Sequence, residues 1–259
     1  MRIFSHTCSN TEIVCALGCG DQLVGVDADS DYPPEIVSRL PQPGRDLDLD
    51  TRAVLALKPD LVLSSLTVPG HERIVDEFTA LGLRTITCDP QSLEDVFDDI
   101  ATIAEALDVR ERGAQLIAQM RAQMPAVTVA KQRPRILVEW WPKPVIAPAR
   151  RSWVNDMIEL AGGRNPCGDI DAKSFSLPDD AQPYIADAVV MSWCGVQVDK
   201  YRPEIVRRRE QWQHWPALRD ERIYPITEAW LGRPGPRLVE GYAALRRIIQ
   251  SVEAGAARG

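Results

Sequence analysis

The first ninety residues alternate short apolar runs with amphipathic stretches. Each apolar run is bounded by polar residues, glycine or proline, which is typical of β-strands. Between the runs, apolar residues recur with helical spacing, and Gly18, Pro59 and Gly82 mark where the helices end. This alternation predicts helices packed on a parallel sheet. The predicted strands are residues 2–5, 23–26, 61–64 and 84–87, and the predicted helices are residues 11–17, 51–57 and 72–81.

A long helical stretch follows the fourth predicted strand. Ser92 can cap a helix, with Asp95 three residues later, and Val96 and Ile100 keep the helical spacing. A second helical run reaches from residue 110 to about residue 124, where Pro125 ends or bends it. We therefore expect residues 92–132 to form a single helical connector.

The pattern of the first lobe then begins again. The repeated segments are residues 135–139, 153–163, 179–191 and 215–226, and an amphipathic helix over 238–249 closes the chain. The predicted fold class is α/β, with two Rossmann-like lobes at residues 1–91 and 133–259. Ligands prefer domain interfaces and the carboxyl ends of parallel strands, so we expect a ligand cleft between the lobes.

Composition narrows the range of functions. The 259 residues carry a net charge of −7, which argues against nucleic acid as a partner. The first residues lack the basic start and apolar run of a signal peptide, which predicts a cytoplasmic protein if Met1 is the native start. Six cysteines show no zinc-type spacing, so we expect neither a metal site nor a cofactor.

The sequence offers no recognisable set of catalytic residues. The motifs of serine hydrolases, P-loop proteins, zinc proteases and dinucleotide-binding proteins do not occur in it. Cys8 is the best candidate nucleophile because it precedes a predicted helix, whose N-terminus lowers the pKa of a thiol. The spacing of the three histidines identifies no base for it. We therefore predict no catalytic residues.

Aromatic residues give a stronger signal. Five of the seven tryptophans fall at strand exits or at a helix start, and Tyr32 follows the second predicted strand. Trp212 and Trp215 lie instead on a charged segment and are expected to pack in the core. The strand-exit set predicts an aromatic pocket for a large, flat or partly apolar ligand. Its members are Trp140, Trp141, Trp153, Trp193 and Trp230.

Several segments, in order, resemble the cobalamin-type class of substrate-binding proteins, which serve ABC importers for vitamin B12 and ferric siderophores. The resemblance covers nearly the whole chain. It is carried by residues 11–13, 23–26, 31–34, 57–62, 69–73, 138–140, 159–163, 193–195 and 233–239. It implies two lobes bridged by a long helix, a monomer, and a location outside the cytoplasm. The segments around Glu139-Trp140 and Arg233 resemble the cobalamin branch more than the siderophore branch.

The resemblance also assigns residues to roles. The implied ligand is a corrinoid, held between the lobes by aromatic and polar contacts and passed to the permease of an ABC importer. The implied ligand contacts are Tyr32, Trp141, Trp153, Trp193, Trp230, Ser9, Asn10 and Arg233. One acidic residue on each lobe is implied to dock to the permease, namely Glu72 on the first lobe and Asp199 or Glu204 on the second.

Three alternatives stay open from the sequence. A protein of the same class could bind a ferric siderophore or heme instead of a corrinoid. A cytosolic corrinoid-handling or thiol enzyme using Cys8 is a different class, and the six cysteines and the missing signal peptide favour it. A cytosolic scavenger or sensor without a transporter is the third.

Overall fold

The computed structural model describes residues 1–128 and 132–256, and the chain divides into two compact units. The first unit consists of Met1–Pro90 and Asp95–Met120, and the second of Gln91–Glu94 and Arg121–Gly259. Each unit is built on its own parallel α/β sheet, which confirms the predicted fold class. Within the described residues, no helix is long and apolar enough to cross a membrane.

The first unit contains a four-stranded parallel sheet in the order β2-β1-β5-β6. Its strands match the predicted ones within a residue or two, because each predicted apolar run is a buried or half-buried strand. They are β1 (Ile3–Ser5), β2 (Leu23–Val26), β5 (Leu61–Ser65) and β6 (Thr85–Cys88). A small antiparallel pair, β3 (Gly44–Arg45) and β4 (Asp48–Leu49), was not predicted.

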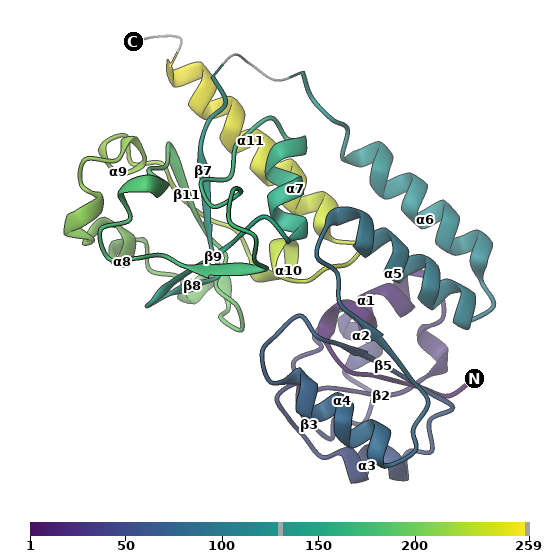
Figure 1. Cartoon of the computed structure of the whole chain (residues 1–259). Helices are drawn as coiled ribbons and strands as arrows, with labels where there is room; N and C mark the ends of the chain where they lie inside the picture. The colour runs from purple at the N-terminus through teal and green to yellow at the C-terminus, as the bar shows by residue number, and fades with distance from the viewer. Residues whose placement is uncertain (129–131, 257–259) are drawn as a thin grey trace. The chain divides into compact units, whose positions relative to one another are not determined.

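Helices α1 (Cys8–Ala16), α2 (Pro34–Val37), α3 (Thr51–Ala56) and α4 (His71–Ala80) connect these strands (Figure 1). The core forms where α4 packs on the sheet. Ile74 and Phe78 from α4 meet Phe4 and Val62 from the strands, and all four side chains are fully buried. This core fixes the strand ends from which the first unit's candidate residues project.

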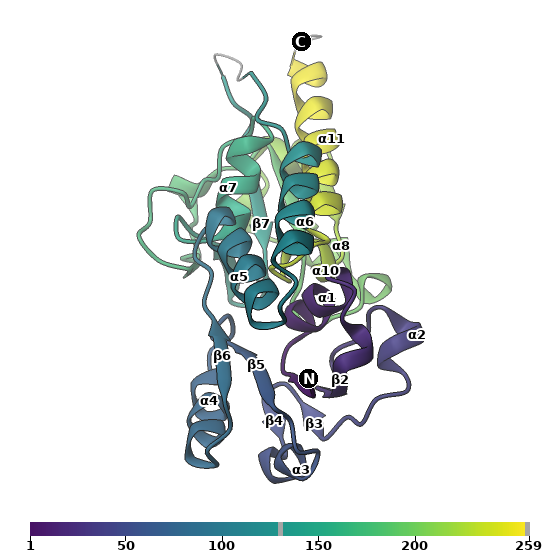
Figure 2. The same ribbon diagram turned by 90° about the vertical axis from the view of Figure 1, so that its right-hand side faces the viewer.

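The helical connector expected over residues 92–132 contains two helices, α5 (Leu93–Ala106) and α6 (Arg110–Gln123), which match the two predicted helical runs. They lie side by side (Figures 1 and 2). The chain reverses at Asp108, whose φ of 57° is left-handed. Gly113 permits the close packing, because a Cβ there would lie 2.5 Å from the Cβ of Ala104. Most of the hairpin belongs to the first unit, so the segment is not a separate domain.

The second unit combines two three-stranded sheets. The parallel sheet has the order β12-β11-β7, with β7 (Ile136–Glu139), β11 (Ala188–Met191) and β12 (Ile223–Pro225). The antiparallel sheet has the order β10-β9-β8, with β8 (Trp141–Pro142), β9 (Val145–Pro148) and β10 (Ser174–Ser176). The lobe repeat therefore predicted the parallel strands but not the antiparallel ones.

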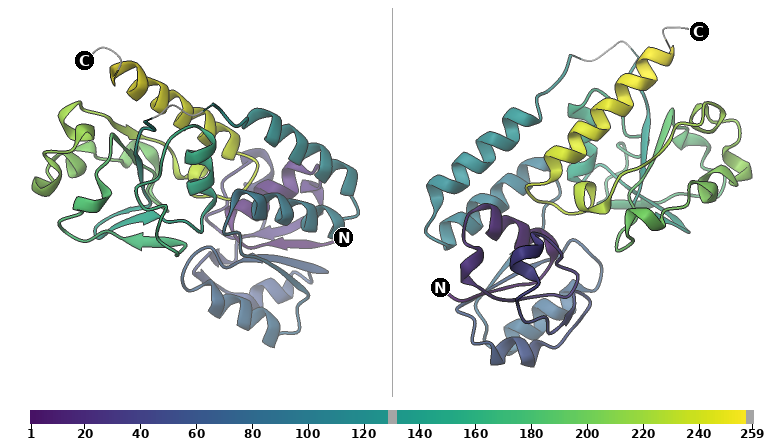
Figure 3. Two further views of the ribbon diagram at one scale, coloured as in Figure 1. Left: turned by 45° about the horizontal axis from the view of Figure 1, so that its top comes forward. Right: turned by 180° about the vertical axis from the view of Figure 1, so that it is seen from behind.

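The helices of the second unit are α7 (Trp153–Leu160), α8 (Pro203–Arg207), α9 (Pro216–Arg219), α10 (Glu228–Leu231) and α11 (Leu238–Ala256). Helix α11 runs beside α7 (Figure 3). It also approaches α10 closely, because a Cβ on Gly241 would lie 2.1 Å from the carbonyl oxygen of Trp230. The helix expected over residues 179–186 is reduced to a 3-10 turn, Gln182–Tyr184.

Candidate functional site

The carboxyl ends of β7, β11 and β12 lie at one edge of the second unit's parallel sheet, because the three strands run in the same direction. The chain leaves β7 into Trp140 and Trp141, leaves β11 into Ser192 and Trp193, and leaves β12 toward α10, which carries Trp230. The pattern of strand exits thus brings tryptophans to one edge of this sheet, as the sequence predicted.

Three of these indole rings are accessible. Trp141 is 41% exposed, and its Nε1 donates a hydrogen bond to the carbonyl oxygen of Lys143 at 3.1 Å. Trp140 and Trp230 are half-buried. The Nε1 of Trp140 is buried, and no group in the described part of the chain accepts a hydrogen bond from it. Trp141 therefore offers the largest exposed aromatic surface at this edge.

Trp153 and Trp193 occupy a different environment from the one that the sequence predicted. They are only 5% and 4% exposed, and both indole nitrogens donate to protein acceptors. Trp153 donates to the carbonyl oxygen of Leu231 at 2.7 Å, and Trp193 to a carboxylate oxygen of Glu139 at 3.3 Å. The ring of Trp153 lies 5.7 Å from that of Trp140. The buried ring of Trp153 therefore packs near the half-buried Trp140, while the buried ring of Trp193 packs near Tyr201.

Arg233 also differs from the expectation of a ligand contact. Its side chain is 11% exposed, and its Nε lies 3.4 Å from a carboxylate oxygen of Glu228. The guanidinium thus forms an ion pair that joins the loop after α10 to the first residue of that helix.

Beneath the aromatic edge lies an ion pair that the sequence did not predict. Glu139 is fully buried at the end of β7, and Arg209, with 14% of its side chain exposed, donates to its carboxylate. Burial raises the pKa of Glu139 above its ordinary value, and Arg209 opposes that change. The sequence signal was a charged residue ending the apolar run Ile136-Leu137-Val138.

Trp212 and Trp215 are core residues, as predicted. They are 3% and 0% exposed, and their rings stack with centroids 4.1 Å apart. The guanidinium of Arg209 lies over the Trp212 ring, 4.2 Å from its centroid. The buried pair and the two stacked rings therefore form one continuous cluster.

In the first unit, Ser9 and Asn10 are positioned by the turn between β1 and α1. Helix α1 begins at Cys8, so Asn10 lies inside the helix and is not its cap. Asn10 is 1% exposed, and its amide donates to the carbonyl oxygens of His6 and Ser64, each at 3.0 Å. Ser9 is 5% exposed and lies 3.2 Å from the hydroxyl of Thr7. Both side chains are buried and hydrogen-bonded within the first unit, and their role as ligand contacts stays a prediction.

Asp27 holds the same turn in place. Its carboxylate accepts hydrogen bonds from the backbone N–H of Thr7 at 2.9 Å and from the hydroxyl of Ser30 at 2.7 Å. Thr7 has a φ of 86°, a conformation that a β-branched residue rarely adopts. Burial raises the pKa of Asp27 to about 6. The strained turn therefore depends on a buried acceptor from the end of β2.

Tyr32 and Cys8 are the more accessible candidates of the first unit. Tyr32 is 45% exposed in the loop after β2, so its predicted contact role fits its position. The thiol of Cys8 donates to the carbonyl oxygen of Asp29 at 2.9 Å. The Cys8 thiol is thus engaged by the backbone of the loop after β2.

His6 and His71 form a buried pair at the carboxyl ends of β1 and β5. Nε2 of His6 lies 2.8 Å from the carbonyl oxygen of Asp46, and Nδ1 lies 2.8 Å from the Ser64 hydroxyl. The ring of His71 packs edge-on against His6, with centroids 4.9 Å apart. Burial lowers the pKa of His6 to about 4. The contacts of His6 match a neutral imidazole with its proton on Nε2.

The predicted docking residues are all exposed. Glu72 lies in the first turn of α4 and accepts a hydrogen bond from the backbone N–H of Gly70 at 2.8 Å. Asp199 lies in the 3-10 turn Val198–Lys200. Glu204 begins α8 and pairs with Arg207 at 3.3 Å. Their exposure permits contact with a partner and leaves the choice between Asp199 and Glu204 open.

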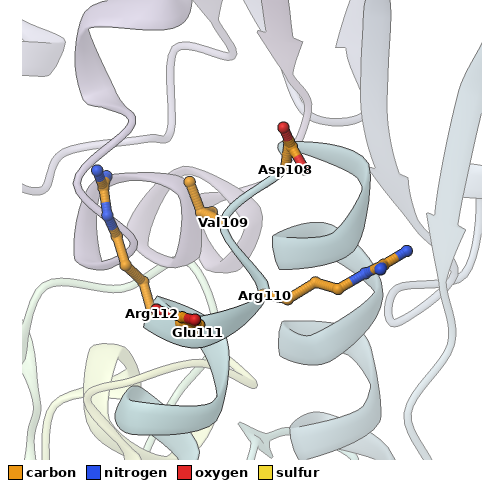
Figure 4. Close-up of a pocket in the computed structure, with 5 residues that line it drawn as sticks. All are labelled: Asp108, Val109, Arg110, Glu111 and Arg112. Atoms are coloured by element: carbon orange, nitrogen blue, oxygen red, sulfur yellow. The ribbon is translucent and has the colours of Figure 1, made fainter.

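Two surface cavities lie away from the aromatic edge. The first, of about 350 Å³, is lined by Asp108–Arg112 at the start of α6, where Arg110 and Arg112 point in opposite directions (Figure 4). The second, of about 410 Å³, is in the second unit and is lined by Arg133, Arg150, Asn155, Glu159, Arg164, Asn165, Gly168 and Asp169. Neither contains a predicted ligand contact. In the ranges 1–128 and 132–256, no group of three or more His, Cys, Asp or Glu side chains could hold a metal ion.

Comparison with known proteins assigns the family. Residues 3–229 match the family model described as periplasmic binding protein. An uncharacterized ABC transporter substrate-binding lipoprotein of Bacillus subtilis is 29% identical over 257 residues, covering 96% of this chain and 79% of that protein. The vitamin B12-binding protein of Vibrio vulnificus is 25% identical over 260 residues, covering 97% of this chain and 91% of that protein.

A solved structure agrees with this assignment. The periplasmic heme-binding protein from Roseiflexus sp. RS-1, in its apo form, superposes with a TM-score of 0.81 at 27% identity. The match covers 97% of this chain and 98% of that one. Similarity therefore extends over both units and includes relatives named for two different tetrapyrrole-type ligands.

Proposed function

The chain belongs to the periplasmic binding protein family, and from this premise we propose that it captures a corrinoid and delivers it to an ABC importer. Members of this family are non-enzymatic transport components that work outside the cytoplasm. The chain is accordingly a substrate-binding protein of an ABC importer. The corrinoid and the residues that contact it are the proposal.

The observation that carries the proposal is the aromatic edge of the second unit. A corrin is broad and largely apolar, and indole rings supply a large contact area at low cost in side-chain entropy. Trp141 presents its exposed ring at this edge, with the half-buried Trp140 and Trp230 as the further accessible indoles there. The full-length similarity to vitamin B12-binding proteins supports the same ligand class.

The proposed mechanism is reversible capture. Trp141 contacts the face of the corrin, and Tyr32 is the corresponding candidate in the first unit. The buried Trp153 packs near Trp140, so little reorganisation of the Trp140 side chain accompanies binding. Glu72 of the first unit, with Asp199 or Glu204 of the second, meets positive charges on the permease and sets its orientation.

Heme is the second candidate, and one feature favours it. Tyr32 is exposed after β2, and a tyrosine side chain is one of the groups that can ligate heme iron. The structural relative from Roseiflexus is named a heme-binding protein. If heme is the ligand, Tyr32→Phe removes the axial ligand and changes the visible spectrum of bound hemin. If a corrinoid is the ligand, the same change weakens binding only modestly.

The test compares the Trp141→Ala variant with the unchanged protein in calorimetric titrations with cyanocobalamin. We expect the dissociation constant to rise about tenfold or more. Losing the indole removes apolar contact area together with a stacking contact worth about 0.5–1.5 kcal/mol beyond that area, and about 1.4 kcal/mol is a factor of ten. Leu55→Ala is the matched control, since Leu55 is 40% exposed on α3, away from the strand exits. Equal affinity of the Trp141 variant and the unchanged protein would remove the aromatic edge from the binding site.

A further inference from the structure

The ion pair beneath the aromatic edge connects three segments of the second unit. Glu139 ends β7, and Arg209 follows α8. The guanidinium of Arg209 donates to both carboxylate oxygens of Glu139, and it also donates to the carbonyl oxygen of Pro142 at 3.1 Å. Arg209 thus binds the residues on both sides of Trp140 and Trp141 in the sequence, namely Glu139 and Pro142.

The rest of the cluster holds Arg209 in place. Its guanidinium packs on the ring of Trp212, which stacks on the fully buried Trp215 with an interplanar angle of 9°. On the other side of the carboxylate, the indole of Trp193 donates to Glu139, and the Tyr201 ring lies 5.1 Å from that of Trp193. Besides each other, Glu139 therefore contacts Trp193, and Arg209 contacts Trp212 and Pro142.

Stability alone does not account for a pair in this place. Removing two opposite charges from water costs free energy that their attraction often fails to repay, and apolar pairs of similar size are frequently as stable or more so. The core of the second unit that contains Trp193, Trp212 and Trp215 is apolar and aromatic, so two apolar side chains in place of Glu139 and Arg209 would be compatible with their surroundings. The feature that an apolar pair lacks is the directed hydrogen bond to the carbonyl of Pro142.

We propose that Glu139 and Arg209 are positioning residues for the ligand: together they fix the backbone over residues 140–142 and so hold the exposed indole of Trp141 ready for the corrinoid. The inference rests on the proposed function for the identity of the ligand. A ring ordered before binding loses less conformational entropy when the ligand arrives, which increases affinity without any new contact. Neither Glu139 nor Arg209 touches the ligand in this account.

The decisive variant replaces both charges at once, as Glu139→Met with Arg209→Met. If the pair positions the ring, the double variant binds cyanocobalamin about tenfold more weakly, while its unfolding midpoint falls by no more than the lost hydrogen bond from Trp193 to Glu139 explains. If the pair only stabilises the fold, the double variant binds cyanocobalamin with the affinity of the unchanged protein. Arg207→Met is the control, because Arg207 precedes Arg209 in the same segment, is 46% exposed and pairs only at the surface with Glu204.

A second readout does not depend on the ligand. In protein labelled with 5-fluorotryptophan, fluorine NMR gives one signal for each indole, and Trp141→Phe assigns the signal of Trp141. We expect one narrow Trp141 signal in the unchanged protein and in Arg207→Met, and a broadened or split one in the double variant. A narrow signal in the double variant overturns the inference. If the unchanged protein binds no corrinoid, the proposed function fails while this readout still tests the positioning role.

A conservative variant covers the case in which the double variant does not fold. Arg209→Lys keeps the charge opposite Glu139 but loses the fork that reaches both the carboxylate and Pro142. We expect it to fold, to broaden the Trp141 signal and to weaken binding. Unchanged affinity together with an unchanged signal in Arg209→Lys would contradict the inference.

Discussion

Trp141 and Trp193 are the same residue type at the same sheet edge, yet their burial gives them opposite roles. Trp141 is 41% exposed and Trp193 is 4% exposed in the core of the second unit. We expect Trp193→Ala to lower the free energy of unfolding by about 3–5 kcal/mol, because it leaves a large cavity. Trp141→Ala should change it by only about 1 kcal/mol or less. Urea denaturation of the two variants measures the difference, and equal losses would contradict the assignment.

The buried His6 predicts a pH dependence of stability. Its pKa is lowered to about 4 in the folded protein, below the ordinary value of 6.5 that it regains on unfolding. Between these values the unfolded chain binds more protons, so the contribution of neutral His6 is complete above pH 6.5 and is lost as pH falls through about 4. The loss amounts to about 3 kcal/mol.

The measurement is the difference in unfolding free energy between the unchanged protein and His6→Gln. A glutamine keeps a donor and an acceptor but does not titrate, so the comparison isolates His6. Asp27 acts in the opposite direction, because its raised pKa favours the folded state as pH falls through about 6, and it remains present in both proteins. A difference that stays constant from neutral pH to pH 4 would contradict a neutral, buried His6.

At the scale of elements, the hairpin of α5 and α6 depends on the absence of a side chain at Gly113. A Cβ there would lie 2.5 Å from that of Ala104, so Gly113→Ala must push the helices apart. We expect a cost of about 1–3 kcal/mol in unfolding free energy, which exceeds the roughly 1 kcal/mol gained from helix propensity. Ala114→Ser, at the exposed neighbouring position, should change it by about 0.5 kcal/mol or less. A stabilised Gly113→Ala variant would show that the helices are not in close contact.

Apolar runs and helical spacing in the sequence predicted those strands and helices that are determined by neighbouring residues. The strands 23–26 and 188–191 and the start of α7 at Trp153 follow from apolar runs and helical spacing, and they agree with the structure. The structure adds that Ser152 caps α7. The reversal at Asp108 was missed, because a left-handed non-glycine residue leaves no clear signal in a helical pattern. The strands β8 and β9 were missed because each is short and is defined by its pairing with a neighbour.

The site was predictable in outline and not in detail. The positions of the strand exits predicted where tryptophans gather, and the resemblance identified the family of substrate-binding proteins. Burial then separated Trp141 and Tyr32 from Trp153, Trp193 and Asn10, and burial depends on segments distant in sequence. The partner of Glu139 is Arg209, seventy residues away, and no local pattern connects the two.

For the whole molecule, delivery requires docking to the importer. Glu72 is exposed in the first turn of α4. We expect Glu72→Gln to leave ligand affinity unchanged while lowering the ligand-dependent ATP hydrolysis of the importer reconstituted in liposomes. The difference from the unchanged protein should shrink as ionic strength rises, because salt screens the charge contact that only the unchanged protein makes. Full stimulation by the variant would remove Glu72 from the docking surface.

The central claim is that the ligand is a corrinoid, and a calorimetric titration of the unchanged protein with cyanocobalamin tests it most directly. Hemin is titrated in parallel under the same conditions. We predict saturable binding of cyanocobalamin at one site, with a dissociation constant of about 1 µM or lower, and weaker binding of hemin. Saturable binding of hemin without any binding of cyanocobalamin at micromolar protein would contradict the claim.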